Sequence, residues 1–285
     1  MKRSSHPFMH LLVLALWSLV LMVVAVVAGA ALGISGTPSV TQSHGHAVVF
    51  LLWNVAVQLL TFALPVVLVT WMYYRDNQRD FYRLDFGRRR WMLALAGVAV
   101  LLFLVPLTDW LTTWNDSWPL PEGLRKVGEE SQQTVEALMK ECHPLLGLFG
   151  LALIPALCEE LFFRAGVQNL LRRWFKNPHA AVWVAAAIFS LAHFELSAFL
   201  PRFFLGALLG YLYLYGRSLL VNVTAHFVNN AIIVLAYAIA ADGNSGFDPS
   251  APLAIPPLLT VACILVAAAL FYGVFLRHKS FPETE

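Results

Sequence analysis

Polar residues that can do chemistry together occur in three short motifs within long apolar stretches. The first motif is EELFFR, from Glu159 to Arg164, the second is FSLAH, ending at His193, and the third is HFVNN, from His226 to Asn230. Hydrolysis requires a base that activates water, a group that holds the water and donors for the developing oxyanion. A carboxylate, two imidazoles and an amide could provide all of these.

The first motif divides into a paired and an unpaired carboxylate. Glu160 and Arg164 are four residues apart, so on a helix they share a face and can neutralise each other. Glu159 lies about 100° further round the same helix and faces something else. Each charged group at the centre of a membrane-spanning helix costs about 2.5 to 3.5 kcal/mol, so such a helix needs polar partners on its neighbours. We expect the Glu160–Arg164 pair to be structural and Glu159 to take part in the chemistry.

The other two motifs supply such partners. His193 would share a helix face with the first residue of FSLAH, and His226 would share one with Asn230, which Asn222 extends by a turn. A single histidine or asparagine within a membrane is more often a contact between helices than a catalyst. An unpaired carboxylate, two histidines and an amide on neighbouring helices are a stronger signal, since burying them is costly. We therefore expect these residues and Glu159 to face one shared cavity.

The composition indicates a membrane protein with many spans. Of the 285 residues, 59% are hydrophobic and 13% are charged, which excludes a soluble domain with one apolar anchor. The apolar runs predict an all-α, polytopic transmembrane helix bundle with about eight spans, at about residues 8–34, 47–74, 91–111, 144–167, 180–200, 201–215, 219–240 and 258–276. A helix at residues 127–139 would lie on the surface. The chain then divides into residues 1–143, with three spans and a surface loop, a four-span core at 144–240, and a loop and last span at 241–285.

The basic residues predict which ends of the spans face the cytoplasm, because cytoplasmic loops carry an excess of lysine and arginine. With both termini cytoplasmic, fourteen of the nineteen basic residues lie on the cytoplasmic side and four on the opposite side, with Arg164 in the membrane. We expect a multi-pass protein of the plasma membrane, the inner membrane in a bacterium, whose first span is retained and not cleaved as a signal peptide. The arginine-rich loop at residues 75–90 would contact anionic lipid headgroups, and no nucleic-acid partner is expected.

The three motifs, in this order and on separate apolar stretches, resemble EExxxR, FxxxH and HxxxN of the CPBP intramembrane proteases, the CAAX-protease and bacteriocin-processing family. The segments FFRAGVQ and LPRFFLGALLGYLY are also similar to bacterial members, and the resemblance covers about residues 144–240. It implies an intramembrane endopeptidase that cuts a hydrophobic or lipid-linked peptide. In this family the eukaryotic branch trims prenylated CAAX ends, whereas bacterial relatives are associated with peptide maturation and with self-immunity against bacteriocins.

The residue types and the resemblance suggest the same division of roles. Glu159 would be the general base for water, and His193 would help to hold and deprotonate that water. His226 and Asn230, one turn apart, would donate hydrogen bonds to the tetrahedral oxygen. The paired glutamate and arginine of the first motif would support it.

A metal is the main alternative for this site. Glu159, His193 and His226 could bind zinc with an open position for water, and the family was long described as metalloproteases. Because the chain lacks an HExxH motif, we expect no cofactor, with zinc as the alternative. Cys158, beside Glu159, could suggest a thiol nucleophile, but a thiol in apolar surroundings is inert by default.

Two other functions are alternatives to an enzyme. A non-enzymatic peptide-binding or bacteriocin-immunity protein would keep the fold but tolerate the loss of Glu159. A proton-coupled transporter could use the carboxylate and the histidines as a relay, but paired halves with broken helices would then be expected, and none are seen in the sequence. The cleavage position and the oligomeric state are left open.

Overall fold

The computed structural model describes residues 6–34, 44–241 and 246–277, and within these ranges it contains helices and no strand. The predicted all-α class is confirmed. Six helical stretches are long and apolar enough to cross a membrane: Pro7–Ala31, Gly45–Tyr73, Pro144–Phe175, Leu196–Gly216, Leu219–Ala241 and Pro257–Leu276. A bent pair, Arg88–Phe103 and Val105–Asp116, makes a seventh if it is counted as one span. The chain is a multi-pass membrane protein.

The N-terminal helices are shaped by prolines. They are α1 (Pro7–Ala31), α2 (His44–Gln58), the π-helical turn η1 (Leu59–Ala63) and α3 (Leu64–Tyr73). Pro65 has no N–H to donate to the carbonyl of Thr61, four residues earlier, so the helix widens at η1. Ser18 of α1 donates to the Thr61 carbonyl at 2.8 Å instead, which joins the two spans.

The middle of the chain contains a bent span and a surface helix. After η2 (Arg75–Asn77) and α4 (Gln78–Tyr82) come α5 (Arg88–Phe103), α6 (Val105–Asp116) and α7 (Glu122–Glu141). The axis bends by 47° between α5 and α6, where Pro106 cannot continue the hydrogen-bond ladder. The surface helix predicted at 127–139 is found in α7, which is longer and buries Ala137, Leu138 and Met139 against the bundle.

The first motif lies on one long helix with two wide turns. This helix comprises α8 (Pro144–Gly147), η3 (Leu148–Leu153), α9 (Ile154–Glu160), η4 (Leu161–Gln168) and α10 (Asn169–Phe175). The π-helical segments η3 and η4 flank α9, and Pro155 accounts for the first, since it removes the hydrogen bond to the Leu151 carbonyl. Such π-helical turns are frequent at functional sites.

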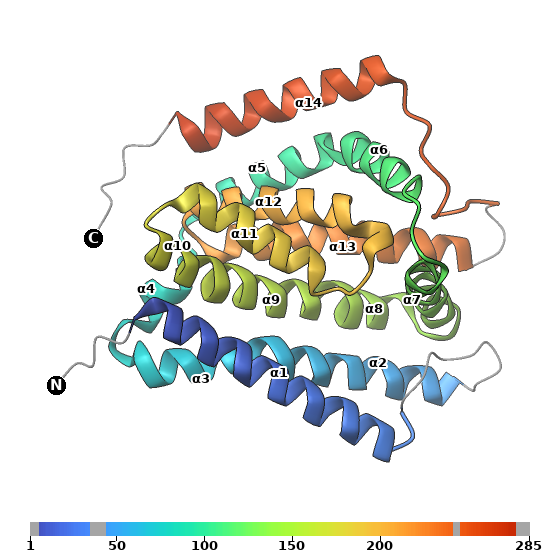
Figure 1. Cartoon of the computed structure of the whole chain (residues 1–285). Coiled ribbons are helices and arrows are strands. Elements are labelled where there is room, and N and C mark those ends of the chain that lie inside the picture. Colours follow the sequence, from blue (N-terminus) through green and yellow to red (C-terminus); the bar gives the residue numbers. More distant parts are fainter. Residues whose placement is uncertain (1–5, 35–43, 242–245, 278–285) are drawn as a thin grey trace.

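The α9 helix occupies the middle of the bundle, with α1, α2 and α3 on one side and α11 to α13 on the other (Figure 1). The preceding η3 turn lies close against α2: a Cβ atom at Gly150 would be 2.6 Å from Leu51 Cδ1. Apolar side chains from α1, α3, η4 and α11 form the largest cluster of the core, which includes Leu14, Val69, Phe163 and Phe189. The charges of the first motif are therefore enclosed on every side by protein.

The predicted fifth span, residues 180–200, is wrong in its C-terminal part. The helix α11 (Pro178–Leu191) stops at Leu191, and η5 (Leu196–Ala198) and α12 (Phe199–Gly216) follow after a turn in which Phe194 has a φ of 55°. With 14 residues, α11 is about 21 Å long and shorter than the hydrocarbon core of about 30 Å. The α11–α12 pair is thus a hairpin whose first arm is too short to span the hydrocarbon core, and whose turn is partly exposed, with Phe194 71% exposed.

The last helices are α13 (Leu219–Ala241), α14 (Pro257–Phe271) and η6 (Tyr272–Leu276). Figure 1 shows the start of α1, α4 and α10 at one end of the bundle and α7 at the other. This places the arginine-rich loop and the basic turn after α10 at the same end, as the charge count requires. The side that faces the cytoplasm and the division into 1–143, 144–240 and 241–285 stay predictions.

Candidate active site

Glu160 sits at the centre of a buried polar network. Its side chain is fully buried. Its Oε2 accepts a hydrogen bond from Asn222 Nδ2 at 3.1 Å and lies 3.1 Å from Arg164 Nε, while its Oε1 lies 2.9 Å from His226 Nδ1. The carboxylate therefore has three polar partners from two helices, α13 and its own, and the predicted Glu160–Arg164 pair is found.

Arg164 is the largest fully buried side chain of the core. Its guanidinium carbon lies 5.2 Å from the centre of the Phe189 ring, a cation–π distance. In the described part of the chain none of its side-chain nitrogens has a hydrogen-bond acceptor with good geometry, so the ion pair with Glu160 is what compensates its charge. Removing either partner would leave an uncompensated charge in the core.

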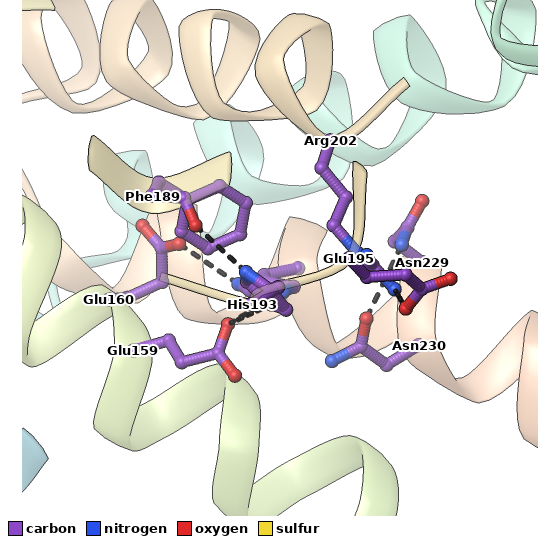
Figure 2. Close-up of polar contacts among 9 residues, drawn as sticks. Glu159, Glu160, Phe189, His193, Glu195, Arg202, Asn229 and Asn230 are labelled. Atoms are coloured by element: carbon purple, nitrogen blue, oxygen red, sulfur yellow. Dashed lines mark hydrogen bonds and ion pairs between the residues drawn. The ribbon is translucent and has the colours of Figure 1, made fainter. Parts of the chain in front are cut away.

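Glu159 faces the histidines. Its Oε2 lies 3.9 Å from His193 Nε2 and 3.8 Å from His226 Nε2, and the residue is 6% exposed (Figure 2). These separations are too long for direct hydrogen bonds. They match an arrangement in which one small molecule, such as water, bridges the oxygen and the two nitrogens.

The protonated nitrogen of His193 follows from its backbone contact. Its Nδ1 lies 2.8 Å from the Phe189 carbonyl oxygen, and since a carbonyl only accepts, Nδ1 carries the hydrogen. In the neutral ring Nε2 then has a lone pair and points towards Glu159. The predicted i, i+4 relation to Phe189 holds through this hydrogen bond, although His193 lies in the turn after α11 and not on the helix.

The turn that carries His193 depends on a residue that the sequence did not single out. Asn115 of α6 is fully buried; its Nδ2 donates to the Leu196 carbonyl at 2.9 Å and its Oδ1 accepts from Leu200 N at 2.6 Å. Ser190 donates to the Phe199 carbonyl at 2.7 Å. These bonds satisfy backbone groups that a broken helix leaves open. Only the tertiary structure reveals Asn115, since it falls in a polar stretch outside the predicted spans.

The residues of the third motif are placed differently from one another. Because the Glu160 carboxylate accepts from His226 Nδ1, the imidazole is fixed with Nε2 towards Glu159. Asn230 lies further along α13, where its Oδ1 accepts from Asn229 Nδ2 at 3.3 Å. Figure 2 shows Asn230 beside Asn229, on the side of Arg202. In the described ranges no hydrogen bond joins Asn230 to the other predicted site residues.

Asn222 has a larger structural role than the predicted extension of the polar stripe on its helix. Besides the bond to Glu160, its Nδ2 donates to the Leu209 carbonyl of α12 at 2.5 Å. A second ion pair, which the sequence did not predict, lies beside His193, where Arg202 Nη2 and Glu195 Oε2 are 2.6 Å apart. Asn222 and the Arg202–Glu195 pair thus each join two elements of the bundle around the motif residues.

The site as positioned does not fit zinc. Tetrahedral ligands at about 2.0 Å from the metal would lie about 3.3 Å from one another, whereas Glu159 Oε2 is 3.9 and 3.8 Å from the two imidazole nitrogens. Among the described residues no group of three or more His, Cys, Asp or Glu side chains is placed to hold a metal ion. Cys158 is a free, buried thiol, and no polar contact in the described ranges links it to Glu159.

A comparison with protein families gives one match. Residues 141–232 match the family described as type II CAAX prenyl endopeptidase Rce1-like. The segment includes all three motifs, and the match confirms the resemblance to the CPBP and CAAX protease family. No match is found among curated proteins or among solved structures.

Proposed function

We propose, from the match of residues 141–232 to the Rce1-like CAAX endopeptidases, that the chain is an intramembrane endopeptidase that hydrolyses a peptide bond in a hydrophobic or lipid-linked peptide. The observation that carries this is the convergence of His193 Nε2 and His226 Nε2 on Glu159 Oε2, at 3.9 and 3.8 Å, distances that a bridging water would span. The plasma membrane is the proposed location.

In this proposal Glu159 is the general base. A water bridges Glu159 Oε2 and His193 Nε2, and Glu159 takes a proton as the water oxygen bonds to the peptide carbonyl carbon. The same proton passes to the leaving nitrogen as the C–N bond breaks, giving a carboxylic acid and an amine. His193, held through Nδ1 by the Phe189 carbonyl, is oriented so that its Nε2 accepts a hydrogen bond from the second hydrogen of the water, which stays on the product carboxyl group.

The oxyanion of the tetrahedral intermediate needs donors. We assign this role to His226 and Asn230. Glu160 accepts a hydrogen bond from His226 Nδ1, so donation to the oxyanion requires that Nε2 also carries a hydrogen. Asn230 uses its Oδ1 towards Asn229, and its Nδ2 is the donor end. No metal enters these steps.

The test compares wild type with Glu159→Gln in cells and in purified form. Membrane and secreted peptides are compared by mass spectrometry at equal protein levels, and cleavage of prenylated and unprenylated hydrophobic peptides is measured in detergent. Glu159→Gln should abolish cleavage while the protein remains folded and inserted, and a longer precursor should accumulate in those cells. Glu129→Gln, the same change on the exposed face of α7, is the control.

The same comparison separates the enzyme from a binding or immunity protein. If Glu159→Gln cleaves as well as the wild type, the assignment of the base is wrong. If neither variant changes any peptide and both protect cells equally against an added bacteriocin, a peptide-binding role replaces the enzymatic one.

A further inference from the structure

A recess at the end of the bundle that contains α4 and α10 is lined by an unusual set of side chains. We call it the arginine recess, and its walls are Arg83, Gln168, Asn169, Arg172, Tyr213 and Leu214. They come from the loop after α4, from the η4–α10 helix and from α12. The recess has no room for a water molecule, so a ligand would sit at its mouth, against the partly exposed side chains of Arg83 and Arg172.

The recess is positively charged and has no acidic wall. Arg83 donates from Nη1 to the Tyr213 carbonyl at 2.9 Å and stacks over the Tyr213 ring at 4.6 Å. Burial lowers the pKa of Arg83, and the nearby charges of Arg217, Arg173 and Arg90 lower it further. Within the described residues no ion pair links Arg83 or Arg172 to a carboxylate. A partly buried cluster of like charges is stabilised by a bound anion.

Buried donors in the recess lack partners. Tyr213 is 2% exposed, and neither its hydroxyl nor Arg172 Nε has a hydrogen-bond partner in the described part of the chain. Such buried atoms are rare in native proteins, because a polar group that loses its hydrogen bonds to water without replacing them destabilises the fold. Gln168 Oε1, which also lacks a partner, is an acceptor at the same recess, so an anion is accommodated on the arginine side of the mouth.

We propose that a phosphoryl group binds at the mouth of the arginine recess, held by the guanidinium groups of Arg83 and Arg172, with Arg83 kept in place by the carbonyl and ring of Tyr213. Planar guanidinium groups match phosphate oxygens in geometry and charge. The predicted topology puts the recess at the cytoplasmic surface, where phosphoryl groups are available from anionic phospholipid headgroups and from soluble phosphate.

A bound phosphoryl group would connect the two helices of the candidate active site at one end. Arg172 lies on the continuous helix that carries Glu159, and the carbonyl of Arg83 accepts a hydrogen bond from Leu219 N at the start of α13. The helix α13 carries His226. The proposal concerns stability and does not depend on the proposed peptidase activity.

The test uses the full chain, purified in a neutral detergent and stripped of lipid. Native mass spectrometry and thermal unfolding are measured with phosphatidylglycerol, with phosphatidylcholine and with inorganic phosphate. Phosphatidylglycerol should stay bound and raise Tm, with phosphatidylcholine having little effect. Arg172→Gln should weaken binding about tenfold, as expected for the loss of one charge-assisted hydrogen bond. Arg79→Gln, an exposed arginine outside the recess, should bind like the wild type.

The Tyr213→Phe variant keeps the ring that Arg83 covers and removes only the unpartnered hydroxyl. It should fold with an unchanged or higher Tm without ligand and keep the shift that phosphatidylglycerol produces, because the hydroxyl is buried below the mouth and does not contact the ligand. A shift with inorganic phosphate alone, abolished by Arg172→Gln, supports the site and identifies the soluble ligand. Equal responses of wild type and Arg172→Gln, equal loss in Arg79→Gln, or no response to either phosphate source would overturn the proposal.

Discussion

The adjacent residues Glu159 and Glu160 of α9 have opposite surroundings. Glu160 has no exposed surface and is bound on both oxygens by Arg164, Asn222 and His226. Glu159 is 3.8 Å or more from the nearest imidazole nitrogen that faces it. A carboxylate bound on both oxygens is a poor base, whereas one whose facing neighbours are beyond hydrogen-bond distance can accept a proton from a bridging water. Substitutions of the two residues should therefore have different effects: loss of catalysis at Glu159 and loss of stability at Glu160.

Glu160→Gln should destabilise the protein. The change leaves Arg164 buried without a counter-charge, and breaking a buried ion pair from one side costs about 3 to 5 kcal/mol. Thermal unfolding in detergent should show a much lower Tm for Glu160→Gln than for Glu159→Gln, which carries the same substitution one residue earlier. A Tm equal to that of Glu159→Gln would contradict the structural role of Glu160.

The imidazoles and Glu159 should act without a metal. The wide spacing of the three atoms favours a bridging water over zinc. We expect protein purified without added metal to contain far less than stoichiometric zinc by elemental analysis, and cleavage to survive a chelator. Stoichiometric zinc that is lost together with activity in His193→Ala would reverse this assignment.

At the scale of the element, the positions of the helices can be predicted from the sequence, whereas the break between α11 and α12 cannot. Apolar runs mark where a helix can lie in a membrane, and the three motifs and their order identify the polar helices. The end of α11 at Leu191 has no such signal, because FSLAH and the residues after it are apolar enough to continue a helix. The chain can stop there because Asn115, distant in sequence, supplies hydrogen bonds to the exposed backbone. Partners of this kind depend on tertiary packing and cannot be predicted from spacing.

Asn115→Ala should loosen the turn that holds His193. It removes the hydrogen bonds to Leu196 O and Leu200 N and leaves both backbone groups unsatisfied, at a cost on the order of 2 kcal/mol. Hydrogen exchange of residues 192–200 should become faster. The loss of peptide cleavage should be large, whereas the decrease in Tm should be small. Asn54→Ala is the matched control, since within the described ranges the Asn54 side chain bonds only to its own helix, at the Phe50 carbonyl. Unchanged exchange in Asn115→Ala would mean that the turn is held by other contacts.

At the scale of the whole molecule, the order of the helices brings every arginine-rich segment to one end. The loop before α5, the basic turn after α10 and the residue after α12 all lie at the end where α1 starts (Figure 1). The α11–α12 hairpin preserves this arrangement, because it enters and leaves the bundle at that end. A hairpin whose first arm ends at Leu191, short of a full span, also explains how His193 can reach Glu159 near the middle of the long first-motif helix.

The orientation itself can be tested with single cysteines. Cys142 and Cys158 are buried and Cys263 is half-buried, so replacing Cys263 by serine gives a suitable background. Glu129→Cys in α7 and Arg79→Cys in α4 both place a thiol at an exposed position, at opposite ends of the bundle. An excess of arginine marks the cytoplasmic side, so a membrane-impermeant thiol reagent should label Glu129→Cys in intact cells and Arg79→Cys only after the membrane is opened. The reverse labelling pattern would mean that the bundle has the opposite orientation in the membrane, with the arginine recess at the outer surface.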